Sequence, residues 1–141
     1  MAKFYEVKLR YQKMQENGTV KKVSEHFLAD ALSLTEAEAK TTEAMQPFIN
    51  GEFVATSAKE SKVAEIMGDK EFGKFYLAKV AFIIIDEKSA KEKKAITQIL
   101  VGAEDFKGAY DALMEGFKGT MADWKIVSLA ESVILDVFTH E

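Results

Sequence analysis

Polar and apolar residues alternate along the first part of the chain. One face of this stretch carries Tyr5, Val7, Leu9 and Tyr11, and the residues between them are charged. A period of two residues is typical of a strand with one buried face. Asn17-Gly18 follows, which is a strong signal for a tight hairpin turn. The pattern therefore predicts a strand at about 5–12, a turn at 16–19 and a return strand at about 20–31.

The pattern changes to a helical period after this hairpin. Ser33 and Glu36 have the spacing of a capping box, in which the serine oxygen accepts a helix N–H and the glutamate reaches back. One face of the helix carries Leu34, Ala37, Thr41, Ala44 or Met45, and Phe48. Pro47 helps to end the helix, and a closing strand is predicted at about 53–67. The length of that strand indicates a bend or bulge near residues 57–61.

Short motifs from the first half of the chain return in the second half. Lys-Phe-Tyr at residues 3–5 recurs at residues 74–76, an offset of 71 residues. The motif Ser-x-x-Glu-Ser occurs at both 57–61 and 128–132. Matches in separate blocks indicate an internal repeat.

The repeat has two predicted copies, residues 3–67 and 74–138, joined by residues 68–73. The second copy predicts strands at about 74–86, 92–102 and 124–138. Its helix has an apolar stripe of Phe106, Ala109, Tyr110, Leu113, Met114 and Phe117. The fold class is therefore predicted as α+β: a duplicated strand–strand–helix–strand unit with six mainly antiparallel strands, two helices on one face and a pseudo-twofold axis. Because one copy alone would have a marginal core, residues 1–141 are expected to form a single domain.

Four phrases of the sequence resemble a known family. They are HFLADALSLTEAEA, KVAFIIIDEKSAKEKKA, FKGTMADWKI and ILDVF, and together they span most of the chain. The family is an uncharacterised one of small proteins from gut anaerobic bacteria and their phages, classified only as a domain of unknown function. The resemblance implies an intracellular, phage- or mobile-element-related origin. It implies no activity and no site residues.

The composition excludes several kinds of chemistry. The chain has no cysteine, so it forms neither disulfides nor thiolate sites. Its histidines are His26, interpreted as a polar strand residue, and His140. The Ser-x-x-Glu-Ser motif has no histidine at a matching spacing, and it is interpreted as a bulge or a strand crossing. We therefore expect a protein that is not an enzyme, with no catalytic residues, no metal and no cofactor.

The apolar segments are too short to suggest a membrane span. The longest strongly apolar run covers residues 80–85, whereas a membrane helix needs about 20 residues. The first residues alternate in polarity and lack the apolar core of a signal peptide. A cytoplasmic location without a membrane partner is expected.

Charge is distributed unevenly in a chain whose net charge is −4. Residues 1–30 hold six basic and four acidic side chains, and residues 74–103 hold six and three. The lysines near the two predicted turns are Lys13, Lys21, Lys22, Lys88, Lys91, Lys93 and Lys94. Two basic hairpins could contact a phosphate backbone, so one hypothesis is an accessory nucleic-acid-binding protein. The alternative is that these lysines only keep the strand ends solvated.

The first strand of the second copy is apolar on both faces. One face carries the even-numbered residues from Tyr76 to Ile84. The other face, which also holds Lys79, carries Leu77, Ala81, Ile83 and Ile85. An antiparallel strand with a solvated side should not be apolar on both faces, so something must cover these residues. The closing strand or the linker could do so, but a twofold homodimer is the commonest way to bury such a patch. Basic hairpins meeting the acidic helical faces of a second molecule are another route to self-association. The leading hypothesis is a non-enzymatic binding or assembly module that acts through protein contacts and self-association.

Overall fold

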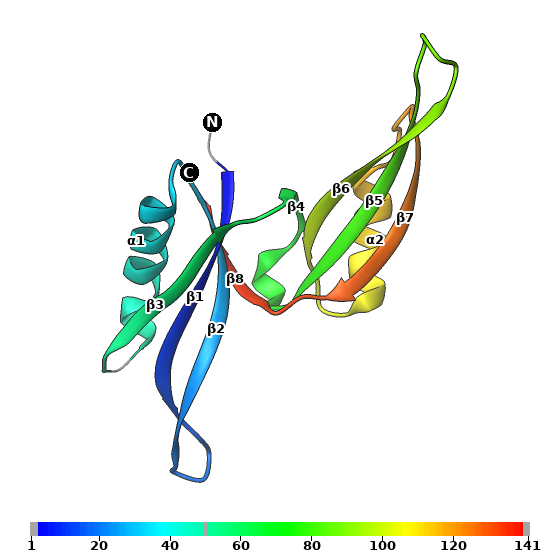
Figure 1. Cartoon of the computed structure of the whole chain (residues 1–141). Helices are drawn as coiled ribbons and strands as arrows, with labels where there is room; N and C mark the ends of the chain where they lie inside the picture. The colour runs from blue at the N-terminus through cyan, green and yellow to red at the C-terminus, as the bar shows by residue number, and fades with distance from the viewer. Residues whose placement is uncertain (1–2, 50, 140–141) are drawn as a thin grey trace. The chain divides into compact units, whose positions relative to one another are not determined.

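The computed structural model describes residues 3–49 and 51–139, which form two compact units. Unit 1 contains the chain up to Ser61 together with the chain from Val133 onward. Unit 2 is the continuous segment Lys62–Ser132. Figure 1 shows that each unit consists of a sheet with one long helix packed on it. Within the described residues, no helix is long and apolar enough to cross a membrane.

Unit 1 is a four-stranded mixed sheet with the strand order β3-β1-β2-β8. Its elements are β1 (Lys3–Met14), β2 (Val20–Ala31), α1 (Leu34–Met45), η1 (Gln46–Phe48), β3 (Phe53–Glu60) and β8 (Ile134–Phe138). Strand β1 pairs antiparallel with β2 and β3, whereas β8 pairs parallel with β2. The sheet therefore has a hairpin at its centre and a strand from the far end of the chain at one edge.

Unit 2 repeats this arrangement with the strand order β4-β6-β5-β7. Its elements are β4 (Val63–Gly68), η2 (Lys70–Phe72), β5 (Phe75–Ile85), β6 (Glu92–Gly102), α2 (Phe106–Gly116) and β7 (Asp123–Glu131). Strand β5 pairs antiparallel with β6 and β7, and β4 pairs parallel with β6. Each central hairpin is thus flanked by one antiparallel and one parallel strand.

The prediction of six strands is wrong, because each predicted closing strand is two strands in two different sheets. The chain leaves the sheet of unit 1 after Glu60 and enters the sheet of unit 2 at Val63. The chain returns to the sheet of unit 1 after Glu131. A backbone hydrogen bond lies at the start of each crossing: the Ser61 N–H donates to Phe4 O and the Ser132 N–H donates to Phe75 O, each at 2.8 Å. The two sheets therefore exchange their last strands.

Two further parts of the fold prediction have different outcomes. The prediction of two helices on one face is wrong, because there are two sheets and each carries its own helix. The prediction of mainly antiparallel strands needs refinement, because both sheets are mixed. The pseudo-twofold axis and the single domain stay predictions.

The core of unit 1 lies between α1 and the odd-numbered residues of β1. Val7 and Leu9 are fully buried there, together with Ala37 on the helix. The helix begins as predicted: Ser33 Oγ accepts from the Glu36 N–H at 3.1 Å, and Glu36 Oε2 accepts from the Leu32 N–H at 3.1 Å. Burying these side chains contributes the main stabilising term of the unit.

The predicted apolar face of α1 is only partly buried. Leu34 and Phe48 are exposed, although both were expected in the core. Pro47 turns the chain into the short η1 helix, which carries Phe48 outward, and Ile49 takes the buried place instead. A helix period extended past a proline therefore misplaces the residues beyond it.

The core of unit 2 has the same construction and is richer in aromatic rings. Ala109, Leu113 and Phe117 of the α2 region pack on the even-numbered residues of β5. Asp105 caps the helix, with its Oδ1 accepting from the Gly108 N–H at 2.7 Å. The Phe117 ring lies 4.9 Å from the Trp124 ring, between their centroids. The helix is thereby fixed on one face of its sheet.

Candidate functional site

Each sheet has a face that does not carry its helix, and we call this the open face of the unit. Side chains alternate between the two faces of a strand, so Glu6, Lys8, Arg10 and Gln12 of β1 lie on the open face of unit 1. Opposite them on β2 are Lys22, Ser24 and His26. At these positions the face is polar and carries several charges, whereas Leu28, which faces Glu6, is buried.

His26 is paired on this open face. Its Nδ1 lies 3.2 Å from Glu6 Oε2, and Lys59 Nζ lies 3.9 Å from the same oxygen. The ring is about three-quarters buried, with a side-chain exposure of 28%. The geometry accounts for His26 as a polar residue of a strand. His140 lies outside the described residues.

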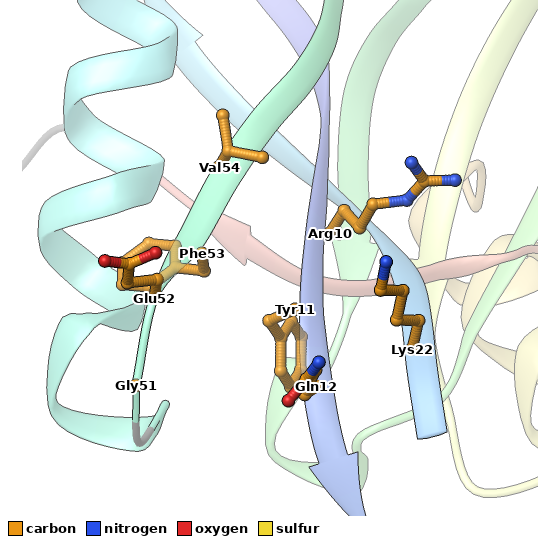
Figure 2. A pocket seen from close by; sticks show the side chains of 8 residues that line it. All are labelled: Arg10, Tyr11, Gln12, Lys22, Gly51, Glu52, Phe53 and Val54. Atoms are coloured by element: carbon orange, nitrogen blue, oxygen red, sulfur yellow. The ribbon is translucent and has the colours of Figure 1, made fainter. Parts of the chain in front are cut away.

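A cavity of about 470 Å³ opens next to the start of β3 in unit 1. Its lining residues are Arg10, Tyr11, Gln12, Lys22, Gly51, Glu52, Phe53 and Val54. Figure 2 shows the Arg10 and Lys22 side chains next to each other, with Val54 and Glu52 coming from the β3 side. Arg10 faces Val54 and Gln12 faces Lys22 in the sheet, so these four share the open face.

Tyr11 lies on the other face of β1, toward the helix. Its hydroxyl donates to Glu25 Oε1, and Lys13 Nζ lies 3.9 Å from Glu25 Oε2. Burial, followed by the hydrogen bond to Glu25, raises the pKa of Tyr11 from 10.0 to about 12. The phenol therefore remains protonated in the folded chain well above its ordinary range.

The lysines predicted as nucleic-acid contacts sit near the tips of the two hairpins. In unit 1, Lys13 and Lys21 face each other across the β1–β2 pair. Lys22 projects from the opposite face, into the cavity. Like charges placed directly opposite one another destabilise a sheet, and the Glu25 carboxylate, 3.9 Å from Lys13 Nζ, offsets part of that repulsion.

Two lysines of the second hairpin contact the Asp86 carboxylate. Lys93 Nζ lies 3.5 Å from Asp86 Oδ2, and the Lys88 N–H donates to Asp86 Oδ1 at 3.0 Å. The Lys88 N–H is the main cause of the lowered pKa of Asp86. Lys91 contributes its backbone oxygen to the same turn, and Lys94 lies on the open face opposite Ile83. Part of the charge on this hairpin is therefore already neutralised.

The open face of unit 2 is apolar where that of unit 1 is polar. It carries the predicted residues Leu77, Ala81, Ile83 and Ile85. Ala81 is buried, Leu77 and Ile83 are half-buried, and Ile85 is exposed. Ile96 faces Ala81 from β6 and is exposed as well. The exposed apolar surface is thus centred on Ile83, Ile85 and Ile96.

The sequence analysis missed two residues that contribute to these open faces through their cross-strand neighbours. Arg10 and Ile96 were not predicted as site residues, because a strand pattern gives the face of a residue but not its cross-strand neighbour. The hairpin turns supply that register, since a turn of known length fixes which residues face each other. The observed turn covers residues 15–19, because Met14 faces Val20, and counting outward from it places Lys22 beside Gln12 and near Arg10. The predicted turn at 16–19 is one residue shorter and would place Lys22 opposite Lys13.

The remaining candidates are the repeated serine motifs and side-chain groups that could bind a metal. The two Ser-x-x-Glu-Ser motifs lie where the chain crosses from one sheet to the other, which is one of the two interpretations given for them. No group of three or more histidine, aspartate or glutamate side chains that could hold a metal is found in 3–49 and 51–139.

The fold and the surfaces together define an α+β protein with two four-stranded mixed sheets, each with one helix and one open face. A family model described as "Domain of unknown function (DUF4494)" matches residues 3–140, so the chain belongs to that family. The predicted resemblance to a family without assigned function is confirmed to this extent. No curated protein matches the chain.

Proposed function

We propose that this protein is a non-enzymatic binding or assembly module that forms a homodimer through the open face of unit 2. The observation that carries the proposal is the exposure of large apolar side chains there: 67% for Ile85 and 60% for Ile96. Val127, at the bulge of β7, is 51% exposed. Exposed apolar patches of this kind mark interaction sites.

A comparison with unit 1 supports the proposal. With the repeat offsets of 71 residues in the first strand and 72 in the second, Ile83 corresponds to Gln12 and Ile96 to Ser24. Both pairs occupy the same positions in their hairpins, since Ile83 faces Lys94 and Gln12 faces Lys22. The same fold therefore tolerates polar residues at these positions, and the isoleucines serve something other than the core.

The charges around the patch favour a second copy of the chain as the partner. In one cross-strand row, Asp123 and Lys94 lie on either side of Ile83. In the neighbouring row Lys125 lies beside Ala81. Acidic and basic side chains thus both border the apolar patch. A twofold axis through the patch lets each acidic group approach a basic group of the other copy.

A second apolar surface of unit 2 competes with this one. Phe106, Tyr110 and Met114 form a row along α2, and each is at least 41% exposed. Their spacing of four residues places them on one helix face. Because this row is on the helix and the isoleucines are on the open face, separate substitutions distinguish the two surfaces.

Light scattering tests the proposal. We expect the wild-type chain to be a dimer at micromolar concentration, and Ile83→Lys and Ile96→Lys to convert it to a folded monomer. The matched controls are Gln12→Lys and Ser24→Lys in unit 1, which should leave the dimer intact. A monomeric wild type, or a dimer broken by Met114→Lys and not by Ile96→Lys, contradicts the proposal.

Nucleic-acid binding is the second candidate, and the length of the first hairpin favours it. Strand β1 pairs with β3 only as far as Tyr11, so the hairpin beyond that point is a two-stranded ribbon. It carries Lys13, Lys21 and Lys22, and β-ribbons are known to enter nucleic-acid grooves. A phage-related origin and a cytoplasmic location belong to this proposal, and the genes beside this one would test them.

Gel shift experiments at low salt test this second candidate. Any binding should weaken steeply as salt is added, because released counterions drive it. Replacing Lys21, Lys22, Lys93 and Lys94 by glutamate should abolish it. No shift with single- or double-stranded probes at low salt contradicts nucleic-acid binding.

A further inference from the structure

The cavity in unit 1 brings together two cations without a carboxylate partner. Arg10 and Lys22 are diagonal neighbours on the open face, since Arg10 faces Ser24 and Gln12 faces Lys22. Neither side chain forms an ion pair with any residue that the structure describes. Cations held at neighbouring positions repel each other. An anion between the two side chains would remove that repulsion.

The chemistry of the pair fits a phosphate group. The guanidinium of Arg10 presents a planar fork of donors that matches two phosphate oxygens, and the Lys22 ammonium supplies a point charge. A phosphate monoester carries a charge of about −1.5 to −2 at neutral pH, so it balances two cations. A carboxylate carries one charge and balances only one of them.

The cavity has the size and the second polar group that a small ligand requires. Its volume of about 470 Å³ lies within the range of roughly 300–1,000 Å³ that is usual for small-molecule sites. Glu52 lies on the same cavity and offers acceptor oxygens. It would repel a phosphate placed beside it, but it can accept hydrogen bonds from hydroxyl groups elsewhere on the ligand.

We infer that this cavity binds a small, hydroxyl-bearing phosphate monoester, with the phosphate held by Arg10 and Lys22 and a ligand hydroxyl held by Glu52. The inference is independent of the proposed dimer, because it concerns the open face of the other unit. In unit 2 the position of Arg10 is occupied by Ala81. The fold therefore does not require a guanidinium at this position.

Titrations of the full chain, followed by heteronuclear NMR, test the inference. The probes are inorganic phosphate, a hexose phosphate and the unphosphorylated hexose, all at one ionic strength. We expect saturable shifts of the backbone amides of Arg10, Gln12 and Lys22 with both phosphates and none with the free sugar. Arg10→Gln and Lys22→Gln should each weaken hexose phosphate binding by about tenfold or more, because each removes a charge-assisted hydrogen bond.

Two control variants separate a built site from general charge attraction. Lys94→Gln removes the lysine of unit 2 that corresponds to Lys22, and it should leave the affinity within about twofold of wild type, since it keeps the charged hydrogen bonds of the cavity. Glu52→Gln should weaken binding of the hexose phosphate and not of inorganic phosphate. Spectra of each variant show whether the chain is folded. All four substituted residues are exposed, so their replacement should not unfold the protein.

Three results would overturn the inference. The first is the absence of saturable shifts with either phosphate. The second is an equal loss of affinity in Lys94→Gln and Lys22→Gln. The third is a single-stranded oligonucleotide that binds far more tightly than the hexose phosphate and depends equally on Lys13, Lys21 and Lys22, since the cavity would then be one part of a nucleic-acid surface.

Discussion

Thr41 lies on the buried side of α1, and its hydroxyl has no hydrogen-bond partner within the described residues. A buried polar group without a partner costs about 1–3 kcal/mol. Thr41→Val keeps the shape of the side chain and removes the hydroxyl, so it should raise the free energy of unfolding by about 1 kcal/mol or more. Urea unfolding measures this difference. Thr42→Val, one position along the same helix, should have little effect, and a less stable Thr41→Val contradicts the assignment.

Tyr11 should make the stability of the protein depend on pH in the alkaline range. Its pKa is raised from 10.0 to about 12 in the folded chain, first by burial and then by Glu25. Between these values the unfolded chain loses the phenol proton while the folded chain keeps it. The free energy of unfolding contributed by Tyr11 is therefore present below pH 10 and is lost as the pH rises toward 12.

The substitution Tyr11→Phe isolates this contribution. Urea unfolding at several pH values between 10 and 12 should show a shallower decline for Tyr11→Phe than for wild type. Tyr110→Phe removes an exposed tyrosine from α2 and should keep the wild-type slope. Equal slopes for all three proteins would show that Tyr11 does not carry the effect.

Single residues were predictable from the sequence where their partners are close in the chain. Ser33 caps its helix through a contact three residues away, and such contacts depend on local spacing. Exposure depends on distant residues, and for that reason Phe48 was placed wrongly in the core. The cationic pair of the cavity was missed for the same reason, because Arg10 and Lys22 are joined by strand register.

At the scale of elements, the exchange of strands determines which part of the chain can fold alone. Residues 62–132 contain all four strands and the helix of unit 2. The sequence repeat 74–138 lacks β4 and includes β8, whose partner β2 lies outside it. We therefore expect the fragment 62–132 to unfold cooperatively in urea, and the fragment 74–138 to be markedly less stable.

A physical reason for the difference is the packing of β4. Met67 packs against the core of unit 2, and its removal should cost about 2 kcal/mol or more. Loss of β4 also leaves the backbone of β6 unpaired along one edge, which invites aggregation. Hydrogen exchange of the Leu100 and Gly102 amides, which lie on the β4 side of β6, would report the open edge. Equal stability of the two fragments would contradict the strand exchange.

The sequence predicted where most elements lie but not which sheet two of them join. Alternation and turn signals are local, whereas the partner of a strand is set by contacts far away in the chain. The position of the crossing was still visible, because residues 57–61 were marked as an interruption of a strand that was too long. The apolar residues Ile83 and Ile85 were found because both faces of one strand can be read directly.

For the whole molecule, the two units combine one strand order with two different open faces. The open face of unit 1 carries Arg10 and Lys22, and that of unit 2 carries Ile83 and Ile96. The cores of the two units have the same construction, whereas their open faces differ. Binding through one unit and self-association through the other could then coexist in a chain of 141 residues.

The insertion of unit 2 between β3 and β8 also determines the order in which the two units can fold during translation. A ribosome makes the first three strands of unit 1 early, but β8, at residues 134–138, emerges after the whole of unit 2. Domains usually fold as units during translation. Unit 2 should therefore be folded while the edge of β2 that pairs with β8 is still unpaired. A chain stopped after Ser132 should keep the hydrogen exchange protection of unit 2 and lose that of the β2 amides that face β8, because the other amides of β2 still pair with β1. Full protection of β2 in this shortened chain would show that β8 is dispensable.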